Sequence, residues 1–541
     1  MIMKKNDIVT LTIDNISTDG NGVAHIDGFP VFVPFTAVGD VIDAKIVKVK
    51  SNLAYGIIDG MISPSPDRVA VDCPVFRKCG GCAYRHISYK AELKVKEDNF
   101  YSTLRRIGHN ECERHPILHS KIVDHYRNKG EFPVNETLDA CLYSRRSHYT
   151  VPMPDDCLIQ DHRITEAAHI VSNVLKDFSL TPYDERTGKG ILRHIYIRSN
   201  HAGSLHICLV INNTYLPDEN KIVSELLNKI DSIDGISINI NKQNTNVILG
   251  KESRVIWGNP ALDDLLCGLP VNVYPPSFLQ VNRSCTEVLY SKVKELANIS
   301  PSDQVLDLYC GMGTIGLYAC EKNTHLTGVE IVPEAVSTAK EISKKLNYKN
   351  AEFICGDAEK IISDILRSDI HYNVVITDPP RKGCSQSTLD SILAMSPDRL
   401  VMVSCNPATL ARDLRYLIDR GYTLEYAVPV DMFPRTVHVE TVCALSKLSE
   451  AKHHINIQVD MDELDLTAAE SKATYEEIQA WVQEKYGFHV SYLNIAKTKR
   501  KCGIIERINY NLPKSDNSKS PETPKEKEDA IIDAFKHFQM I

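Results

Sequence analysis

The sequence predicts an α/β protein in which a doubly wound parallel sheet follows a small β-barrel and a mixed α+β middle region. Short apolar strands alternate with helical stretches over residues 276–446, as in a doubly wound sheet. Short β-rich runs separated by Gly and Asp clusters fill residues 1–62, which is typical of a closed all-β module. The chain of 541 residues is 43% hydrophobic, which allows several packed domains.

Composition and charge narrow the class of protein. The net charge is −8, from 62 Lys and Arg against 70 Asp and Glu, which argues against a basic coat but allows a local basic groove. The first residues contain no long apolar stretch, and no apolar run approaches the ~20 residues of a membrane span. Sixteen cysteines in such a chain indicate reduced thiols, metal ligands or catalytic groups. We therefore expect a cytoplasmic protein without membrane contact, acting as a monomer.

The barrel is expected from the runs DIVTLTI, GVAHI, PVFVPF and VIDAKIVKVK. Lys45, Lys48 and Lys50 lie along its last strand but one and are expected to share one face, which either is solvated or contacts RNA. The middle region, residues 63–275, contains strands such as HIYIR and SLHICLVI.

The carboxy-terminal extension, residues 450–541, has one expected amphipathic helix in TYEEIQAWVQEKYG. A basic run follows, then a flexible linker over residues 513–528. The run either adds RNA affinity or is a solvated loop, and it consists of Lys497, Lys499, Arg500 and Lys501.

A glycine-rich turn follows the strand VLDLYC and carries Gly311 and Gly313 ahead of a helix. Glycines there let the backbone approach a ligand closely, although the pattern alone also fits a dinucleotide site. Glu330 ends the next strand, where a carboxylate accepts hydrogen bonds from both ribose hydroxyls of an adenosine. Asp357 ends a third strand near the expected adenine edge, and Asp378, in TDPP, forms a lip over the pocket. This combination resembles the Rossmann-like fold of S-adenosylmethionine-dependent methyltransferases.

Two downstream segments supply reactive side chains. Cys405 ends the apolar strand of VMVSCNP, and Glu440 lies in MFPRTVHVET. Carbon 5 of uracil is a poor nucleophile, but a thiolate that adds to carbon 6 turns the ring into an enolate that accepts a methyl group at carbon 5. A base must then remove the carbon-5 proton before the cysteine leaves. Cys405 fits the nucleophile and Glu440 the base, although a cysteine alone is equally typical of a small buried hydrophobe.

These segments, SCNPATLARD and MFPRTVHVET, together with PSFLQVN, resemble the RNA (uracil-5-)-methyltransferase family, which includes the 23S ribosomal RNA and tRNA 5-methyluridine enzymes. The resemblance covers residues 1–446. It implies that Cys405 is the nucleophile and Glu440 the proton acceptor. It also implies that the methyl donor and target base are contacted by Gln280, Tyr309, Glu330 and Asp378. Arg435 departs from the family, which often has His there, without affecting either reactive group.

Four further cysteines form a candidate metal site. Cys73, Cys79 and Cys82 follow a C-x5-C-x2-C spacing, and Cys157 lies far downstream. Four thiolates bind either an iron–sulfur cubane or zinc, and the Gly-Gly pair before Cys82 permits a tight turn between ligands. The spacing argues against radical enzymes that use S-adenosylmethionine. The resemblance implies a [4Fe–4S] cluster ligated by these four residues, with zinc as the alternative.

Several segments are expected to contact RNA. The barrel resembles the TRAM module, an oligonucleotide-binding-type fold. Residues 126–129 (YRNK) and 143–149 (YSRRSHY) mix bases with aromatics, which suits phosphate contacts and base stacking, although each alone also fits a structural surface.

The resemblance predicts methylation of a uridine in 23S ribosomal RNA, because the barrel with the four-cysteine site resembles the ribosomal branch. The same chemistry on tRNA is the main alternative. An RNA-binding protein with an inactive methyltransferase fold is disfavoured by the pair Cys405 and Glu440. An enzyme acting on proteins or small molecules is disfavoured by the barrel and the four-cysteine site.

Overall fold

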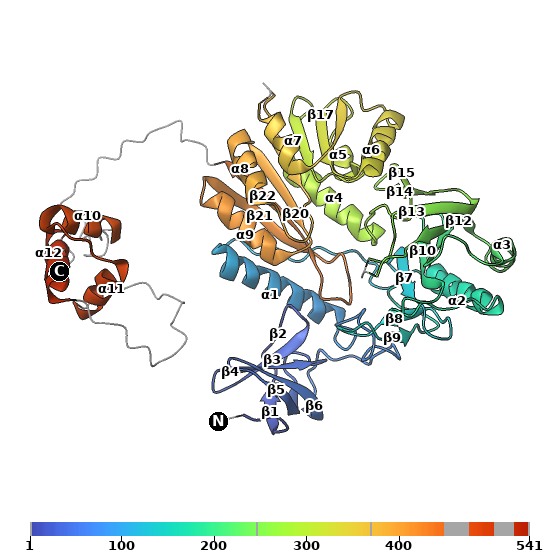
Figure 1. Cartoon of the computed structure of the whole chain (residues 1–541), viewed down its shortest axis with the longest axis horizontal. Coiled ribbons are helices and arrows are strands. Elements are labelled where there is room, and N and C mark those ends of the chain that lie inside the picture. The colour runs from blue at the N-terminus through green and yellow to red at the C-terminus, as the bar shows by residue number, and fades with distance from the viewer. Residues whose placement is uncertain (1–2, 245–246, 368–369, 448–474, 503–523, 539–541) are drawn as a thin grey trace. The chain divides into compact units, whose positions relative to one another are not determined.

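The computed structural model describes residues 3–244, 247–367, 370–447, 475–502 and 524–538 (Figure 1). The chain forms two compact units, residues 1–449 and 450–541. In the described ranges, no helix is long and apolar enough to cross a membrane.

The amino-terminal strands form a barrel because the sheet's two edges belong to one stretch of chain. The strand order is β1-β5-β6-β4-β3-β2, and only two residues separate β1 from β2. Alternate apolar side chains such as Leu11, Val31 and Ile42 fill the interior. The strands are β1 (Ile8–Thr12), β2 (Asn15–Ile16), β3 (Asn21–Ile26), β4 (Phe29–Pro34), β5 (Val41–Val49) and β6 (Ala54–Ser63).

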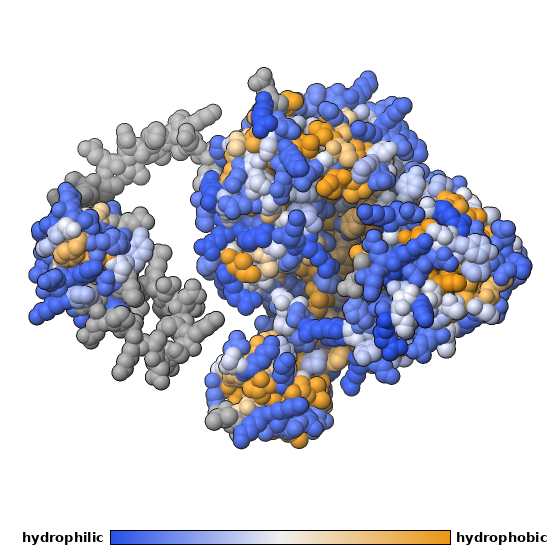
Figure 2. All heavy atoms as spheres, viewed as in Figure 1, coloured by the Kyte–Doolittle hydropathy of each residue, from blue (hydrophilic) through white to orange (hydrophobic). Residues whose placement is uncertain are grey.

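A β-bulge in β5 decides where its lysines point. Lys45 lies opposite Ile57 of β6 and Lys48 opposite Tyr55, with a register shift between them. Strict alternation would put these two lysines on opposite faces, but the extra residue of the bulge returns Lys48 to the face of Lys45. Lys50 follows the strand, with its Nζ 5.8 Å from the centre of the Tyr55 ring. Exposed apolar side chains also gather on the barrel, as Figure 2 shows.

The middle region is a five-stranded sheet in the order β13-β12-β11-β10-β7. One face is apolar and packs against two helices, with Ile195, Ile207 and Leu209 in the shared core. Two hairpins, β8–β9 and β14–β15, flank it. The bounds are β7 (Lys129–Pro133), β8 (Cys141–Tyr143), β9 (Thr150–Pro152), α2 (His162–Asp177), β10 (Leu192–Ser199), β11 (Leu205–Ile211), α3 (Glu219–Lys229), β12 (Ile233–Ile240), β13 (Glu252–Gly258), β14 (Leu262–Leu266) and β15 (Leu269–Val273).

The seven-stranded sheet confirms the predicted doubly wound fold, with one addition. Its order is β18-β17-β16-β19-β20-β22-β21, and β22 lies antiparallel between β20 and β21, while the other strands are parallel. The order reverses beside β16, where such sheets bind ligands at the carboxyl ends of their strands. The bounds are α4 (Arg283–Ala297), β16 (Gln304–Leu308), α5 (Thr314–Ala319), β17 (His325–Glu330), α6 (Pro333–Lys345), β18 (Ala351–Cys355), α7 (Ala358–Ile365), β19 (Val374–Thr377), α8 (Gln386–Met395), β20 (Arg399–Ser404), α9 (Pro407–Ile418), β21 (Tyr422–Val430) and β22 (Glu440–Lys447).

Helix α1 (Tyr89–Gly108) ties the amino-terminal segments to this sheet. Its Phe100 and Leu104 lie in one core with Leu410 and Leu414 of α9. Gly108 allows close packing, since a Cβ there would lie 3.3 Å from the carbonyl oxygen of Ala411. The chain segment between the barrel and the middle region therefore packs against α9 on one face of the sheet.

The second unit contains α10 (Tyr475–Tyr486), α11 (Tyr492–Lys501) and α12 (Lys525–His537). These helices share an apolar core that includes Ile478, Val482, Ile495, Ile531 and Phe535. The first helix was predicted from the sequence. The basic run ends α11 and is not a loop, since cations are favoured at a helix carboxyl end, and Lys501 pairs with Glu528 at 2.8 Å.

The predicted linker over residues 513–528 is wrong at its end. Residues 513–523 lie outside the described residues, but residues 525–528 form the first turn of α12. Glu526 and Glu528 favour a helix there because anions stabilise its amino end. The apolar residues that bind α12 to the core begin only at Ala530, beyond the charged stretch.

Candidate active site

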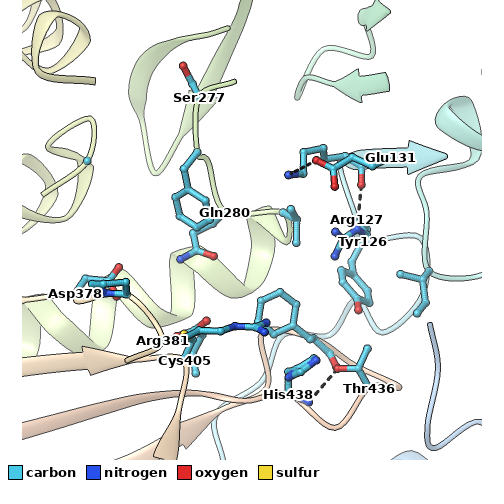
Figure 3. A pocket seen from close by; sticks show the side chains of 18 of the residues that line it. Tyr126, Arg127, Glu131, Ser277, Gln280, Asp378, Arg381, Cys405, Thr436 and His438 are labelled. Atoms are coloured by element: carbon cyan, nitrogen blue, oxygen red, sulfur yellow. Dashed lines mark hydrogen bonds and ion pairs between the residues drawn. The ribbon is translucent and has the colours of Figure 1, made fainter. Parts of the chain in front are cut away.

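One cavity of about 1130 Å³ opens at the carboxyl ends of the parallel strands of the seven-stranded sheet (Figure 3). Its walls come from this sheet, from the segment before α4, from the middle region and from the segment that joins the barrel to α1. The predicted site residues that line it are Gln280, Tyr309, Gly311, Glu330, Asp357, Asp378, Cys405 and Glu440, with Cys73, Cys79, Cys82 and Cys157. Gly313 is the one predicted donor-site residue that does not line it among the described residues.

The turn after β16 is bent by three left-handed residues, Tyr309 (φ 63°), Gly311 (φ 55°) and Gly313 (φ 70°). Tyr309 is not a glycine, so this conformation costs roughly 1 kcal/mol or more, which is common at ligand sites. Gly311 has open space where a Cβ would be, whereas at Gly313 a Cβ would lie 2.6 Å from the Phe353 ring. Gly311 thus exposes backbone to the cavity, and Gly313 serves packing.

Two strand-end carboxylates border this turn. Glu330, at the end of β17, accepts hydrogen bonds from the N–H of Gly311 at 3.1 Å and of Val332 at 2.9 Å. Asp357 caps α7 by accepting from the N–H of Glu359 at 3.0 Å. Both carboxylates are therefore fixed by backbone and line the cavity.

Asp307, which the sequence reading passed over, holds the same turn from behind. It is fully buried in β16, and its carboxylate accepts from the N–H of Gly316 at 3.0 Å. Burial raises its pKa to about 8, and the charges of Asp378 and Glu330 raise it as well. An acid inside the otherwise apolar strand VLDLYC was the available signal.

The proposed nucleophile and base meet through strand pairing. Cys405 follows β20 and Glu440 begins β22, and these antiparallel strands pair Ser404 with Thr441. The Thr441 hydroxyl donates to the Ser404 carbonyl at 2.8 Å, which fixes the register. Cys405 is half-buried and Glu440 is buried.

Three acidic groups share this desolvated corner. Burial raises the pKa of the Cys405 thiol, and the charges of Glu440 and Asp378 raise it further. Burial also raises the pKa of Glu440 well above its usual range, and the charge of Asp378 adds to this effect. Burial alone raises the pKa of Asp378 to about 7. Arg381 opposes the shifts, because its positive charge lowers the pKa of both Cys405 and Glu440.

Arg381, Thr436 and His438 line the cavity without having been singled out from the sequence (Figure 3). The Thr436 hydroxyl oxygen accepts from the N–H of His438 at 3.1 Å. Burial lowers the pKa of His438, and the charge of Arg381 lowers it too. His438 is therefore held neutral near pH 7. The RTVHVE segment around Glu440 was the signal for these residues.

Gln280 is buried in the cavity wall, and Figure 3 shows its amide pointing into the space. The main-chain carbonyl of Gln280 accepts a hydrogen bond from the Asn128 side chain at 3.2 Å. The backbone N–H of Asn128 donates to the Val281 carbonyl at 2.9 Å. Asn282 caps α4 and donates to the Met432 carbonyl at 2.9 Å. The segment is thus clamped between the middle region and the chain leading to Glu440.

The two mixed basic and aromatic clusters differ in position. In the first, Arg127 and Lys129 line the cavity, and Lys129 pairs with Glu131 at 3.0 Å. In the second, the Arg145 guanidinium lies 4.8 Å from the centre of the Phe35 ring, so it packs against the barrel. Tyr149 of this cluster is 82% exposed. The first cluster therefore faces the cavity, and the second joins the barrel to the middle region.

Four cysteines from two distant segments line the same cavity: Cys73, Cys79, Cys82 and Cys157. The first three precede α1, and the last lies in the loop before α2. Gly80 allows the first segment to approach β8 closely, since its N–H donates to the Tyr143 carbonyl at 2.9 Å and a Cβ there would lie 3.2 Å from that oxygen.

The surroundings of these thiols suit bound metal. Burial raises the pKa of Cys82 to about 12, while the charge and hydrogen bond of Arg85 lower it. Burial raises the pKa of Cys79, whereas the N–H of Gly81 and the charge of Arg145 lower it. Charge on the neighbouring cysteines raises both pKa values, so unligated thiolates disfavour one another. Thiolate donors beside buried cations fit either a cubane or zinc.

A second group of metal-binding residue types lies close by. His125, Asp156 and His162 place one ligand atom each within 4.8 Å of the others. The two rings stack with centroids 3.4 Å apart, and His162 Nδ1 lies 3.1 Å from Asp156. Rings stacked this closely do not converge on one ion, so hydrogen bonding and stacking account for the cluster.

The sheet order, the glycine-bearing turn with its strand-end carboxylate, and the reactive pair beside it define an S-adenosylmethionine-dependent methyltransferase. Residues 88–448 match the tRNA (uracil-5-)-methyltransferase family and residues 4–58 match the TRAM domain. The chain belongs to the tRNA (uracil-5-)-methyltransferase family and carries a TRAM domain. It is therefore a methyltransferase that acts on RNA.

The relatives and a solved structure match this chain over nearly their whole length. An uncharacterized RNA methyltransferase of Halalkalibacterium halodurans is 40% identical over 448 residues, covering 82% of this chain and 98% of the relative. One from Oceanobacillus iheyensis is 39% identical over 453 residues, covering 83% and 98%. The crystal structure of Pyrococcus abyssi tRNA (uracil-54, C5)-methyltransferase with S-adenosyl-L-homocysteine is 26% identical, with a TM-score of 0.64, covering 81% of this chain and 99% of that one.

Proposed function

We propose that this enzyme methylates carbon 5 of a uridine in 23S ribosomal RNA through a covalent adduct of Cys405, acting as a cytoplasmic monomer. The observation that carries the chemistry is the pairing of β20 with β22, which brings a thiol and a buried carboxylate together at one end of the donor cavity. The thiol would attack carbon 6, and the carboxylate would remove the proton from carbon 5.

The proposed reaction balances without a further reactant. The Cys405 thiolate bonds to carbon 6, and the electron pair of the 5,6 double bond moves into an enolate. Carbon 5 then takes the methyl group as the bond from methyl to sulfur breaks, which leaves S-adenosylhomocysteine. Glu440 removes the carbon-5 proton, the double bond re-forms, and the thiolate leaves.

The raised pKa values fit this sequence of steps. A carboxylate with a raised pKa is a stronger base, and burial raises the pKa of Glu440 well above its usual range. Tyr309, Glu330 and Asp357 border the glycine turn and hold the donor in the proposal. In the proposal Asp378 also contacts the donor, and Gln280 lines the part of the cavity shared by the donor and the target base.

For the four-cysteine site we propose a [4Fe–4S] cluster that serves structure. The cluster would cross-link two segments of the cavity wall, those of Cys82 and Cys157. The buried Arg85, which pairs with Asp124 at 2.5 Å, would offset its negative charge. Zinc bound by the same thiolates is the outcome that would replace this assignment.

The choice of 23S ribosomal RNA rests on the resemblance of the barrel and four-cysteine site to the ribosomal branch. A tRNA substrate is the second candidate, because the solved tRNA enzyme of Pyrococcus abyssi matches this chain over 99% of its own length. The same catalytic chemistry serves both, so discrimination lies in the barrel and middle region.

Mass-spectrometric mapping of 5-methyluridine in cells lacking this protein distinguishes the two. Loss of one or two modified uridines from 23S ribosomal RNA, restored by the gene, is the expected result. Loss from tRNA alone would refute the ribosomal substrate and leave the chemistry standing. Unchanged 5-methyluridine in both RNAs would refute the proposed function.

A further inference from the structure

The loop that leads to Glu440, residues 431–439, is held by contacts to its main-chain carbonyls. Phe433, Thr436 and His438 of this loop line the cavity, as does Glu440 at its end. Each carbonyl from residue 431 to 435 accepts a hydrogen bond from outside the loop. The donors, in order, are Cys285 Sγ (3.2 Å), Asn282 Nδ2 (2.9 Å), Lys96 Nζ (3.1 Å), the Tyr126 hydroxyl (3.0 Å), and the N–H groups of Ala83 (2.7 Å) and Tyr84 (3.2 Å).

Lys96 is the charged member of this set. It lies on α1, is 2% exposed, and its ammonium donates to Glu92 at 2.8 Å, to Asp431 at 2.6 Å and to the Phe433 carbonyl at 3.1 Å. An ammonium has three donors, so all are used. Burial by itself lowers the pKa of Lys96, but the charges of Glu92 and Asp431 outweigh it and raise that pKa.

Glu92 contacts a second point of the loop. Its carboxylate also accepts from the N–H of Arg435 at 2.6 Å, and the Arg435 side chain lies 3.6 Å away. Arg435 has a left-handed backbone with φ 70°, a conformation that surrounding contacts must hold. One lysine–carboxylate pair on α1 thus fixes two points of the loop, Phe433 and Arg435.

Stability alone does not account for this arrangement. Buried ion pairs gain little over well-packed apolar residues, because desolvation offsets their attraction. What this cluster does provide is a fixed position for the loop. The Lys96 ammonium donates to the Phe433 carbonyl, and the Glu92 carboxylate accepts from the Arg435 N–H. Strand pairing begins at Glu440, which pairs with Val430 of β21, so the loop that precedes it depends on hydrogen bonds from other segments of the chain.

We propose that Lys96 is a positioning residue for the base: its ammonium holds the loop of residues 431–439 so that Glu440 meets the carbon-5 proton of the covalent adduct. The inference rests on the proposed roles of Cys405 and Glu440. Lys96 itself is absent from the cavity lining and acts through the loop. Its loss should therefore impair proton removal more than the attack of Cys405, which comes from a different strand.

Two RNA probes separate these half-reactions. A transcript of the mapped substrate is prepared with uridine or with 5-fluorouridine at the target. Fluorine at carbon 5 cannot leave as a proton does, so adduct formation on the fluorinated RNA reports only attack and methyl transfer. On uridine RNA, release of product also requires the base.

The full-length Lys96→Met variant should form adduct on fluorinated RNA at the wild-type rate. On uridine RNA its kcat should fall about a hundredfold with KM unchanged, because a misplacement near 1 Å has that scale of effect, and the methylated adduct should accumulate. Lys94→Met is the matched control, since Lys94 lies on the same helix but is 77% exposed and pairs only with Asp98. It should behave as wild type.

A second variant guards against misfolding. Lys96→Met with Glu92→Gln removes one charge of each sign from the buried cluster, and the Tyr89 hydroxyl still donates to Asp431 at 2.8 Å. It should fold and still accumulate adduct on uridine RNA. Wild-type turnover by this double variant, or equal losses on both RNAs, would overturn the inference. Glu440→Gln is run in parallel: if it also fails to accumulate adduct, the proposed function fails, and not the role of Lys96 alone.

Discussion

Two kinds of cysteine site line one cavity, and the charged groups beside them differ. Cys405 lies beside two carboxyl groups, Glu440 and Asp378, whose charges raise its pKa. At the four-cysteine site, the guanidinium groups of Arg85 and Arg145 lower the pKa of Cys82 and Cys79, against the effect of burial. The nearest charges therefore favour the thiol at Cys405, whereas at Cys79 and Cys82 they offset part of the effect of burial, although the pKa values of both remain raised.

The charges around a cysteine can suit it to metal binding or to nucleophilic attack. A metal ligand must stay a thiolate throughout, and nearby cations favour that form. A nucleophile that must also leave needs a thiolate only for part of the cycle. The acidic neighbours of Cys405 disfavour its free anion, and one of them, Glu440, is the proposed base.

Substituting Cys405 should have the largest effect. Cys405→Ala should abolish methyl transfer to RNA, because no other group can activate carbon 5. Binding of S-adenosylmethionine should remain within about threefold of wild type, since the thiol acts on the base and not on the donor. Transfer of labelled methyl and calorimetric donor binding measure the two. Measurable turnover by this variant would contradict the assignment of Cys405 as the nucleophile.

Substituting a ligand of the other site should change metal content first. Anaerobically purified wild type should carry about four irons per chain, and Cys157→Ser should lose most of them. Methyl transfer should decline less than in Cys405→Ala, because no step passes through the cluster. Metal analysis and absorbance spectra give the answer. Stoichiometric zinc without iron in the wild type would contradict the cluster and leave a thiolate metal site.

The pH dependence should separate the two sites further. Only the thiolate of Cys405 attacks, and its pKa is raised, so kcat/KM should increase with pH from about 7 to about 9, by up to tenfold per pH unit. Its alkylation rate should rise over the same range. The four ligated thiols should stay unreactive at each pH until metal is removed. A flat pH profile would mean that Cys405 is already a thiolate near neutral pH.

A purely structural cysteine supplies the smallest effect. Cys443 lies on β22, three residues after Glu440, and is fully buried in the core beside α9. Cys443→Ala should cost about 1 kcal/mol of unfolding free energy, because it leaves a small cavity, and should leave turnover unchanged. Urea unfolding and the methyl-transfer assay check both. A large loss of activity would show that strand β22 transmits core packing to the base.

Much of the fold and site was predictable because the informative residues stand at strand ends. Glu330 and Cys405 close apolar strands, and parallel strands bring their carboxyl ends to one edge. The glycine pattern could not say which glycine faces the ligand, and Gly313 packs against Phe353. Asp307 was passed over because it lies inside a strand.

The rest depends on contacts between distant segments. Lys96 reaches Asp431, 335 residues away, and the Tyr126 hydroxyl reaches Pro434, 308 residues away. No local pattern marks such pairs, since a lysine on an amphipathic helix is normally solvated. The last helix was missed because its charged first turn is typical of linkers, while its apolar face lies further on.

The most direct test of the account is the fate of RNA bound to Glu440→Gln. This variant keeps Cys405 but cannot remove the carbon-5 proton, so turnover should fall by about 10²–10⁴-fold while a covalent RNA–protein adduct accumulates. Intact mass spectrometry after incubation with S-adenosylmethionine and substrate RNA should find protein, RNA and one added methyl group in a single species, with Cys405 as the attachment site. Full turnover without adduct would contradict the assignment of Glu440 as the base.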